Sequence, residues 1–252
     1  MEWRDNAIIL ALYPLGEHDV RAELLTPLHG RVFGVVKGGR SRRRRGSLQP
    51  GTSVDAVWRA RIESQLGVLT IEPLRVRNIA LAGGPARLAA MMSCCALASM
   101  MIAERDPHAA IHAGLEAVLD LLDTDQPDDD FTTWAPAIVR WELGLLAEAG
   151  SGLDLGSCAA TGVTENLTHV SPRSGRAVSR DAAAPWRSRL LALPPFLREG
   201  GGEAAASASD VLDGLRLTGF FIERHLLAHD RRGLPDARVR LLERIAAAAS
   251  SG

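Results

Sequence analysis

The residue pattern changes at Gly83-Gly84-Pro85, and this change divides the 252-residue chain into two parts of different secondary structure. Before it, short apolar runs are separated by turn residues, which is typical of β-strands. After it, the chain is rich in alanine, leucine and methionine and loses strand alternation, which indicates helices. We therefore expect an α+β protein, with a β domain over residues 1–80 and a helical domain over residues 84–250.

The clearest predicted strand covers residues 52–63. Apolar side chains from Val54 to Ile62 alternate there with charged ones, and a period of two suits a half-buried strand. Four further runs predict strands, at residues 6–13, 20–25, 31–37 and 67–76. About five short strands joined as hairpins predict a small closed barrel of the OB type.

The second part of the chain predicts five longer helices and one short one. Their expected ranges are 85–104, 107–122, 131–149, 208–229 and 236–248, with the short helix at 186–193. Between the third and the short helix, residues 151–185 form a polar, irregular insertion. Such a segment is too long for a simple connection, and long loops usually have a function or have lost one.

Charge is distributed unevenly along the chain. The net charge is −1, but residues 1–80 carry 13 Lys and Arg against 8 Asp and Glu, about +5. The remaining residues carry 16 against 22, about −6. A basic β domain favours an anionic partner such as nucleic acid.

The segment Lys37–Gly46 places six cations within nine residues, between two predicted strands. Its flanking glycines predict a mobile loop, and guanidinium groups suit phosphate oxygens in a bidentate geometry. Neighbouring strands would extend this patch, with Phe33 as the one aromatic side chain placed to stack on a base. The predicted DNA contacts are Arg31, Lys37, Arg40, Arg42, Arg43, Arg44, Arg45, Arg59 and Arg61. The alternative is a solvated basic loop, because Lys37 is the only lysine and arginine clusters arise easily in so arginine-biased a chain.

Signals for catalysis, metal binding and membrane insertion are weak. The seven histidines are scattered, and no phosphate-binding loop, nucleophile elbow or HExxH motif occurs. His108 and His112 share a predicted helix face but lack further ligands, which favours surface residues over a metal site. The three cysteines make no disulfide framework, and no apolar run reaches the length of a membrane span. We expect a cytoplasmic protein that has no cofactor and is not an enzyme.

Two other function classes remain open. The first is a protein-interaction adaptor whose helical domain is the active part, and the second is an enzyme with a dispersed site, such as a nuclease. A very apolar helix contains Met91, Met92, Met100 and Met101 beside Cys94 and Cys95. Packing in a helical core is the favoured interpretation of that helix, and a groove for a hydrophobic peptide is the alternative.

Several separated motifs occur in the order found in one bacterial family. They are MEWRDNAIIL, LLTPLHGRVFGVVKGGRSRRRR, LQPGTSVDAVWRAR and WELGLLAEAGSGLDLGSCAATG. Together they resemble the RecO family of recombination mediators. The resemblance implies an N-terminal OB fold, a helical C-terminal domain and a cytoplasmic, nucleoid-associated role in DNA repair.

The resemblance also implies partners. It implies binding of single- and double-stranded DNA, annealing of complementary strands, association with RecR, and help in loading RecA onto strands covered by single-stranded DNA-binding protein. The C-terminal tail of that protein would bind the helical domain, where Arg140 matches a basic position of the family's groove.

The chain departs from the family's zinc-ribbon-like insertion, which often holds zinc through two CxxC pairs. The four corresponding positions are Cys158, Thr161, Ser179 and Ala182. One thiolate does not make a tetrahedral zinc site, so we expect no metal there. Packing and hydrogen bonds would hold this insertion, with Ser171–Gly175 as a hairpin turn.

Overall fold

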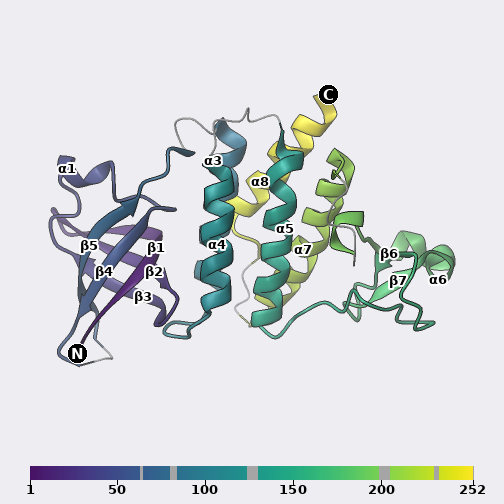
Figure 1. The fold of residues 1–252 in the computed structure, drawn as a ribbon, viewed down its shortest axis with the longest axis horizontal. Coiled ribbons are helices and arrows are strands. Elements are labelled where there is room, and N and C mark those ends of the chain that lie inside the picture. The colour runs from purple at the N-terminus through teal and green to yellow at the C-terminus, as the bar shows by residue number, and fades with distance from the viewer. Residues whose placement is uncertain (63–64, 80–83, 124–129, 199–204, 230–232, 252) are drawn as a thin grey trace. The chain divides into compact units, whose positions relative to one another are not determined.

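The computed structural model describes residues 1–62, 65–79, 84–123, 130–198, 205–229 and 233–251. Its contacts divide the chain into an N-terminal unit, Met1–Gln126, and a C-terminal unit, Pro127–Gly252. The first contains the strands labelled β1 to β5 in Figure 1, followed by two long helices. The second contains three long helices and a small sheet. Among the described residues, no helix is long and apolar enough to cross a membrane.

Five strands close into the predicted OB-type barrel. They pair in the order β1-β2-β3-β5-β4, and β4 pairs back onto β1. Within the barrel, β3 and β5 pair in parallel, whereas the other described strand pairs are antiparallel. The strands are β1 (Glu2–Leu15), β2 (Asp19–Thr26), β3 (Gly30–Val36), β4 (Ser53–Arg59) and β5 (Gly67–Arg75).

Strand β4 confirms the alternating pattern but is shorter than predicted. Val54, Ala56 and Trp58 lie in the barrel core. The strand ends at Arg59 because its pairing with β1 ends there, opposite Glu2. Beyond it Ile62 is 52% exposed, so it does not continue the apolar face, and Glu63 lies outside the described residues.

The packing of Trp58 requires a glycine on the neighbouring strand. A Cβ atom on Gly67 would lie 2.2 Å from the indole ring of Trp58, so a side chain there would displace it. The indole Nε1 donates a hydrogen bond to the carbonyl oxygen of Phe33 at 3.0 Å. This buried ring therefore links β4 to β5 by close packing and to β3 by a hydrogen bond.

The arginine run forms a helical turn, α1 (Arg42–Arg45), and the predicted loop is wrong in this respect. Its backbone makes local hydrogen bonds, since the amide of Arg44 donates to Ser41 O at 3.0 Å and that of Leu48 to Arg44 O at 2.8 Å. Leu48 then enters the barrel core, where it is 8% exposed. The core anchors the end of this turn, a relationship that the glycine-flanked sequence did not reveal.

Two helices pack with the barrel in the N-terminal unit, α3 (Gly84–Met101) and α4 (Ala109–Leu122). Arg77, which is 3% exposed, fastens α4 to the barrel. Its Nη1 donates to Gly51 O at 2.7 Å, and its Nη2 contacts Glu116 at 2.6 Å and also Asp120. Both helices begin and end within a few residues of their predicted limits.

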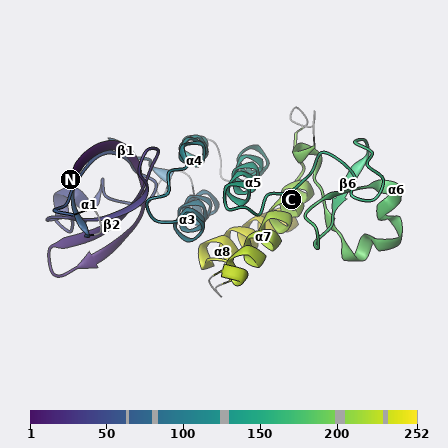
Figure 2. The ribbon, with the colours of Figure 1, turned by 90° about the horizontal axis from the view of Figure 1, so that it is seen from below.

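The C-terminal unit is built on α5 (Phe131–Glu148), α7 (Ala208–His229) and α8 (Asp236–Ser251). Figures 1 and 2 show α7 beside α8. Trp134, Ile138, Leu215, Ile222 and Leu241 are buried in its interior. These three helices agree closely with the predicted ranges.

The polar insertion and the residues that follow it contain a three-stranded sheet in the order β7-β6-β8, and residues 151–198 are together called the insertion below. Its strands are β6 (Leu167–Val170), β7 (Ala177–Ser179) and β8 (Leu191–Ala192), with α6 (Arg180–Ala183) beside them. The predicted helix at 186–193 is wrong. A 3₁₀-helix covers Ala184–Arg189, and the chain then extends because Leu191 pairs with Val170.

The connection between β6 and β7 is the expected hairpin turn. The amide of Gly175 donates to Ser171 O at 2.9 Å, and Gly175 has a φ of +70°, a conformation that glycine adopts without strain. The sequence also predicts connecting loops at residues 123–130 and 200–204, and these lie largely or wholly outside the described residues.

Candidate nucleic-acid interface

The segment that carries the arginine run is tied to the start of β2. Asp19 accepts hydrogen bonds from Lys37 Nζ at 2.8 Å and from the Gly38 amide at 2.9 Å. These two bonds lower the pKa of the Asp19 carboxyl below its usual value, the side-chain bond from Lys37 contributing most. The amide of Arg40 also donates to His18 O at 3.0 Å. The cations are therefore held at a fixed place beside the β1–β2 hairpin.

Most of these cations keep their charge available to solvent. Arg42 and Arg43 are exposed and make no ion pair with any residue that the structure describes. Arg40 donates to Gly16 O at 2.9 Å, and Arg44 makes a longer contact of 3.4 Å with Lys37 O. Neither bond involves a carboxylate, so neither neutralises a guanidinium. The side chain of Arg45 lies outside the described part of the chain.

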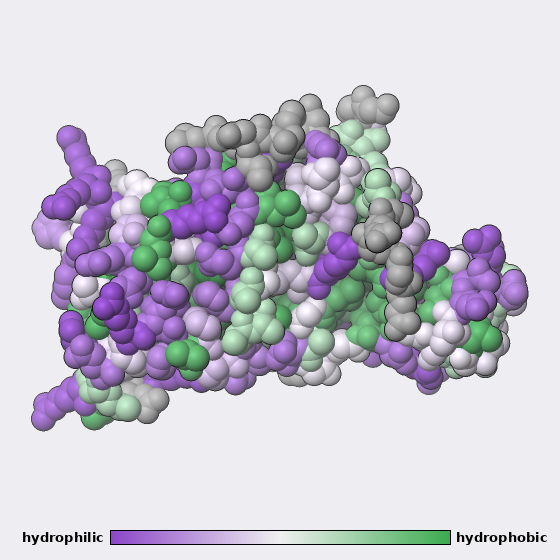
Figure 3. Space-filling view, in the orientation of Figure 1, coloured by the Kyte–Doolittle hydropathy of each residue, from purple (hydrophilic) through white to green (hydrophobic). Residues whose placement is uncertain are grey.

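A row of outward-facing residues crosses four strands of the barrel. Arg21 lies opposite Val35, Val35 opposite Val68, and Val68 opposite Arg59. Neighbouring strands are about 4.8 Å apart, so this row, hereafter the barrel row, spans roughly 14 Å. Arg21 and Arg59 are exposed, and Val68 is 45% exposed. Figure 3 shows one face of the barrel, on which hydrophilic residues predominate.

Arg59 and Arg61 lie at the end of the barrel row. Arg59 contacts Glu2 at 2.7 Å, and both side chains are 56% exposed, so water and salt screen this pair strongly. Arg61 is exposed in the β4–β5 connection, and no ion pair joins it to a described residue. A shallow pocket there is lined by Arg59, Arg61, Leu66 and Val68, which combines cations with apolar surface.

Arg31 differs from the other predicted contacts because it is largely buried. Its side chain is 17% exposed and its Nη1 contacts Glu23 at 2.9 Å. Its Nε donates to Ile102 O at 2.7 Å, just beyond α3. Glu23 is 1% exposed and accepts a further bond from Ser99 Oγ on α3 at 2.7 Å. The structure therefore places Arg31 as a brace between β3 and the end of α3.

Phe33 is half-buried, and its ring is already covered by cations. The guanidinium carbons of Arg21 and Arg31 each lie 5.2 Å from the ring centroid. Arg21 also lies 4.6 Å from the centroid of Tyr13, which is 39% exposed.

Arg21 and Tyr13 are not among the DNA contacts predicted from the sequence. Pairing β1 with β2 across the turn at Gly16 places them directly opposite each other. The register of this hairpin is the signal from which Arg21 and Tyr13 could have been identified in the sequence.

In the C-terminal unit, Arg140 contacts the aromatic residue Phe196. The Arg140 Nη2 donates to Phe196 O at 3.0 Å, and the guanidinium carbon lies 5.4 Å from the Phe196 ring centroid. Arg140 is otherwise exposed on α5. The Met91 helix is α3 of the other unit, where Met91, Cys94 and Cys95 are buried, as expected for core packing.

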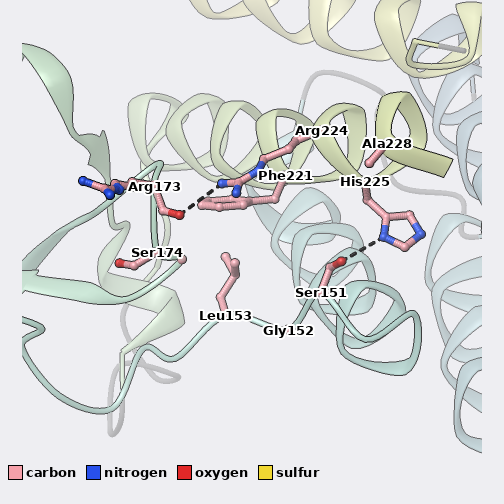
Figure 4. A pocket seen from close by; sticks show the side chains of 10 residues that line it. Ser151, Gly152, Leu153, Arg173, Ser174, Phe221, Arg224, His225 and Ala228 are labelled. Carbon is pink, nitrogen blue, oxygen red and sulfur yellow. Dashed lines mark hydrogen bonds between the residues drawn. The ribbon is translucent and has the colours of Figure 1, made fainter. Parts of the chain in front are cut away.

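A second feature of the C-terminal unit is a pocket of about 240 Å³, shown in Figure 4. Phe221, Arg224 and His225 line it from α7, and Leu153 lines it from the segment after α5. Arg224 Nη1 donates to the carbonyl oxygen of Pro172 at 2.7 Å, which holds the hairpin turn against α7. Arg224 and Phe221 line the same pocket, which gives Arg140 a natural comparison.

Hydrogen bonds surround the one cysteine that remains in the insertion. The amide of Ser179 donates to Cys158 Sγ at 3.3 Å. Burial opposes the thiolate, but bonds from the side chains of Ser179 and Thr161 and from the amides of Ser179 and Ala160 lower the pKa of the Cys158 thiol to about 6.

No group of three or more His, Cys, Asp and Glu side chains that could hold a metal occurs among the described residues. His108 contacts Asp106 at 3.1 Å, while burial lowers the pKa of His112.

Known proteins resemble this chain over nearly its whole length. The family described as Recombination protein O N terminal matches residues 1–77, and Recombination protein O C terminal matches residues 84–234. DNA repair protein RecO of Rhodospirillum centenum is 50% identical over 246 residues, which cover 97% of this chain and 94% of that protein. DNA repair protein RecO of Rhodospirillum rubrum is 49% identical over 245 residues, 97% and 96% of the two chains. The DNA repair protein RecO of Methylocella silvestris is 45% identical over 238 residues, 94% and 93% of the two chains. The chain therefore belongs to the RecO family of DNA repair proteins.

Proposed function

We propose that this protein is a DNA-binding recombination mediator that works without a chemical step. It binds single- and double-stranded DNA without marked sequence preference and anneals complementary strands. Together with RecR, it helps to load RecA onto strands covered by single-stranded DNA-binding protein. The observation that carries the proposal is the set of exposed, uncompensated arginines fixed beside an OB barrel.

The proposed interface combines the arginine turn with the barrel row. Lys37, Arg40 and the arginines of α1 contribute phosphate contacts, and Arg59 and Arg61 extend them to the β4–β5 connection. OB barrels bind nucleic acid over the β2–β3 face and over the loops β1–β2 and β4–β5. Arg21 of β2 lies on that face and Tyr13 of β1 lies directly beside it, and we add both to the interface. Arg31 is left out of the phosphate contacts, because its charge is already paired with Glu23.

Phosphate contacts explain why sequence would matter little. Arginines that neutralise phosphates release counterions, and this free energy does not depend on the bases. Neutralising two strands at once lowers their mutual repulsion, which is what annealing requires. We place the DNA-binding part at residues 1–80 and the partner-binding part at residues 84–250.

The experiment is a comparison of charge-matched variants of the full chain. We expect Arg42, Arg43 and Arg44→Ala to weaken binding to an oligothymidine by at least about tenfold, measured by fluorescence anisotropy, because three phosphate contacts are lost. The control removes three exposed arginines from the C-terminal unit, Arg216, Arg240 and Arg244. Equal losses in the two variants would show that only net charge matters, and would contradict the proposed site.

An adaptor function remains the second candidate, and the Arg140–Phe196 contact favours it. A cation beside an aromatic ring suits an acidic peptide that ends in apolar residues, such as the tail of single-stranded DNA-binding protein. We expect Arg140→Ala to weaken binding of a tail peptide, and Arg224→Ala to leave it unchanged. The reverse result would move the peptide site to the pocket of Figure 4.

A further inference from the structure

The insertion carries a second basic segment, inside the acidic part of the chain. Residues 171–198 contain six arginines and one acidic residue, Asp181. Arg176 is paired with Asp154 at 3.0 Å. Arg180, Arg187 and Arg189 are exposed, and no ion pair joins them to any residue within the described ranges. Their charge is therefore open to an outside anion.

Positive groups lie close together in this part of the fold. Burial lowers the pKa of His169, and the charges of Arg187 and Arg198 lower it further. Burial also lowers the pKa of Arg198, the charge of Arg180 adds to that effect, and Asp210 partly opposes it. Like charges that lie close together repel one another, so the arrangement destabilises the free protein and favours binding of an anion.

Trp186 stands among these arginines with its ring open to solvent. It is 55% exposed, whereas Trp58, Trp134 and Trp141 are buried and Trp3 is half-buried. The guanidinium carbon of Arg189 lies 5.8 Å from the Trp186 ring centroid. Exposing an indole to water is unfavourable, and an aromatic ring beside cations is the usual platform on which unpaired bases stack.

The scaffold beneath these residues is held by regular hydrogen bonds. The 3₁₀-helix Ala184–Arg189 joins α6 to β8, and β8 pairs with β6. Figures 1 and 2 show α6 beside β6. The amide of Arg180 donates to Asn166 O at 2.9 Å, and that of Leu193 to Thr168 O at 2.9 Å. The exposed indole and cations thus project from a defined surface.

We infer that Arg180, Trp186, Arg187 and Arg189, the insertion patch, form a second contact surface for single-stranded nucleic acid. The three arginines bind phosphates and Trp186 stacks on an unpaired base. This inference rests on the proposed DNA-binding function and adds a second site to it. With two surfaces on one chain, the barrel can hold one strand while the insertion patch holds another.

The test uses the full-length chain with two insertion-patch variants, Trp186→Ala and Arg180, Arg187 and Arg189→Ala. We expect Trp186→Ala to weaken binding to an oligothymidine by about fivefold or more and to change duplex binding less, because duplex bases are already stacked. Trp186→Phe should restore most of the affinity, since it keeps an aromatic face. The triple variant should weaken both kinds of binding and make the log-log salt slope less negative by about 2.

Controls separate this inference from the proposed function. Phe220→Ala removes an exposed ring elsewhere in the C-terminal unit and should leave DNA binding unchanged. Melting temperatures of all variants show whether they fold. If only the Arg42, Arg43 and Arg44→Ala variant loses affinity, the insertion patch does not bind DNA, while the proposed function stands. If neither set loses affinity, both fail. If the insertion-patch variants bind DNA normally but lose an acidic tail peptide, the surface binds protein instead, which also overturns the inference.

Discussion

Arg238 of α8 and Glu142 of α5 form an ion pair that is closed to solvent. The Arg238 Nε donates to Glu142 Oε1 at 2.6 Å and its Nη2 donates to Oε2 at 3.0 Å, while the side chains are 1% and 0% exposed. Thr218 of α7 also donates to Glu142. One buried carboxylate therefore joins the three long helices of the C-terminal unit.

Removing either partner of this pair should strongly destabilise the protein. We expect Arg238→Met or Glu142→Gln to lower the free energy of unfolding by about 3–5 kcal/mol, because each leaves a buried charge without its partner. Denaturant unfolding measures this. Arg240→Met, two residues further along α8 and exposed, should cost less than about 0.5 kcal/mol. A similar cost for Arg238→Met and Arg240→Met would contradict the assigned role.

Arg31 should behave as a structural residue rather than as a DNA contact. Arg31→Met leaves the buried Glu23 carboxylate without its cation, and we expect a loss of about 3 kcal/mol in the free energy of unfolding. At a temperature where the variant is folded, its salt slope for DNA binding should equal that of the wild type. A stable Arg31→Met variant with a shallower salt slope would show that Arg31 contacts DNA.

Cys158 should make stability depend on pH. Its thiol pKa is lowered from the ordinary value of 9.0 to about 6 in the folded state, so the folded protein holds the thiolate more readily than the unfolded chain does. The resulting stabilisation is complete above about pH 9 and is lost as pH falls through 6. We therefore expect the stability difference between wild type and Cys158→Ala to grow in favour of the wild type from pH 6 to pH 9. A difference that stays constant across this range would show that the thiolate is not preferentially stabilised.

The barrel could be predicted from the sequence because its signals are local. Alternation from Val54 to Trp58 and the turn around Gly30 are visible in a few consecutive residues. The helices followed similarly from apolar periodicity. The short helix expected at 186–193 failed because Leu191 pairs with Val170, twenty-one positions earlier in the chain.

The candidate interface could be predicted only in part, because charge alone does not reveal a partner. The exposed state of Arg42 and Arg43 agrees with the expectation from sequence, whereas the burial of Arg31 depends on the carbonyl of Ile102, far along the chain. Arg21 went unnoticed because its importance depends on strand register, through which it faces Tyr13 and joins the barrel row. The insertion patch was hidden by the negative charge of the chain around it.

The salt dependence of oligothymidine binding by the full chain tests the proposed DNA-binding site most directly. With about six phosphate contacts, the wild type should show a log-log slope of about −4. Arg42, Arg43 and Arg44→Ala should bring the slope to about −2, while Arg216, Arg240 and Arg244→Ala should leave it near −4. If the first variant keeps the wild-type affinity and slope, the arginine turn does not bind DNA and the proposed function is wrong.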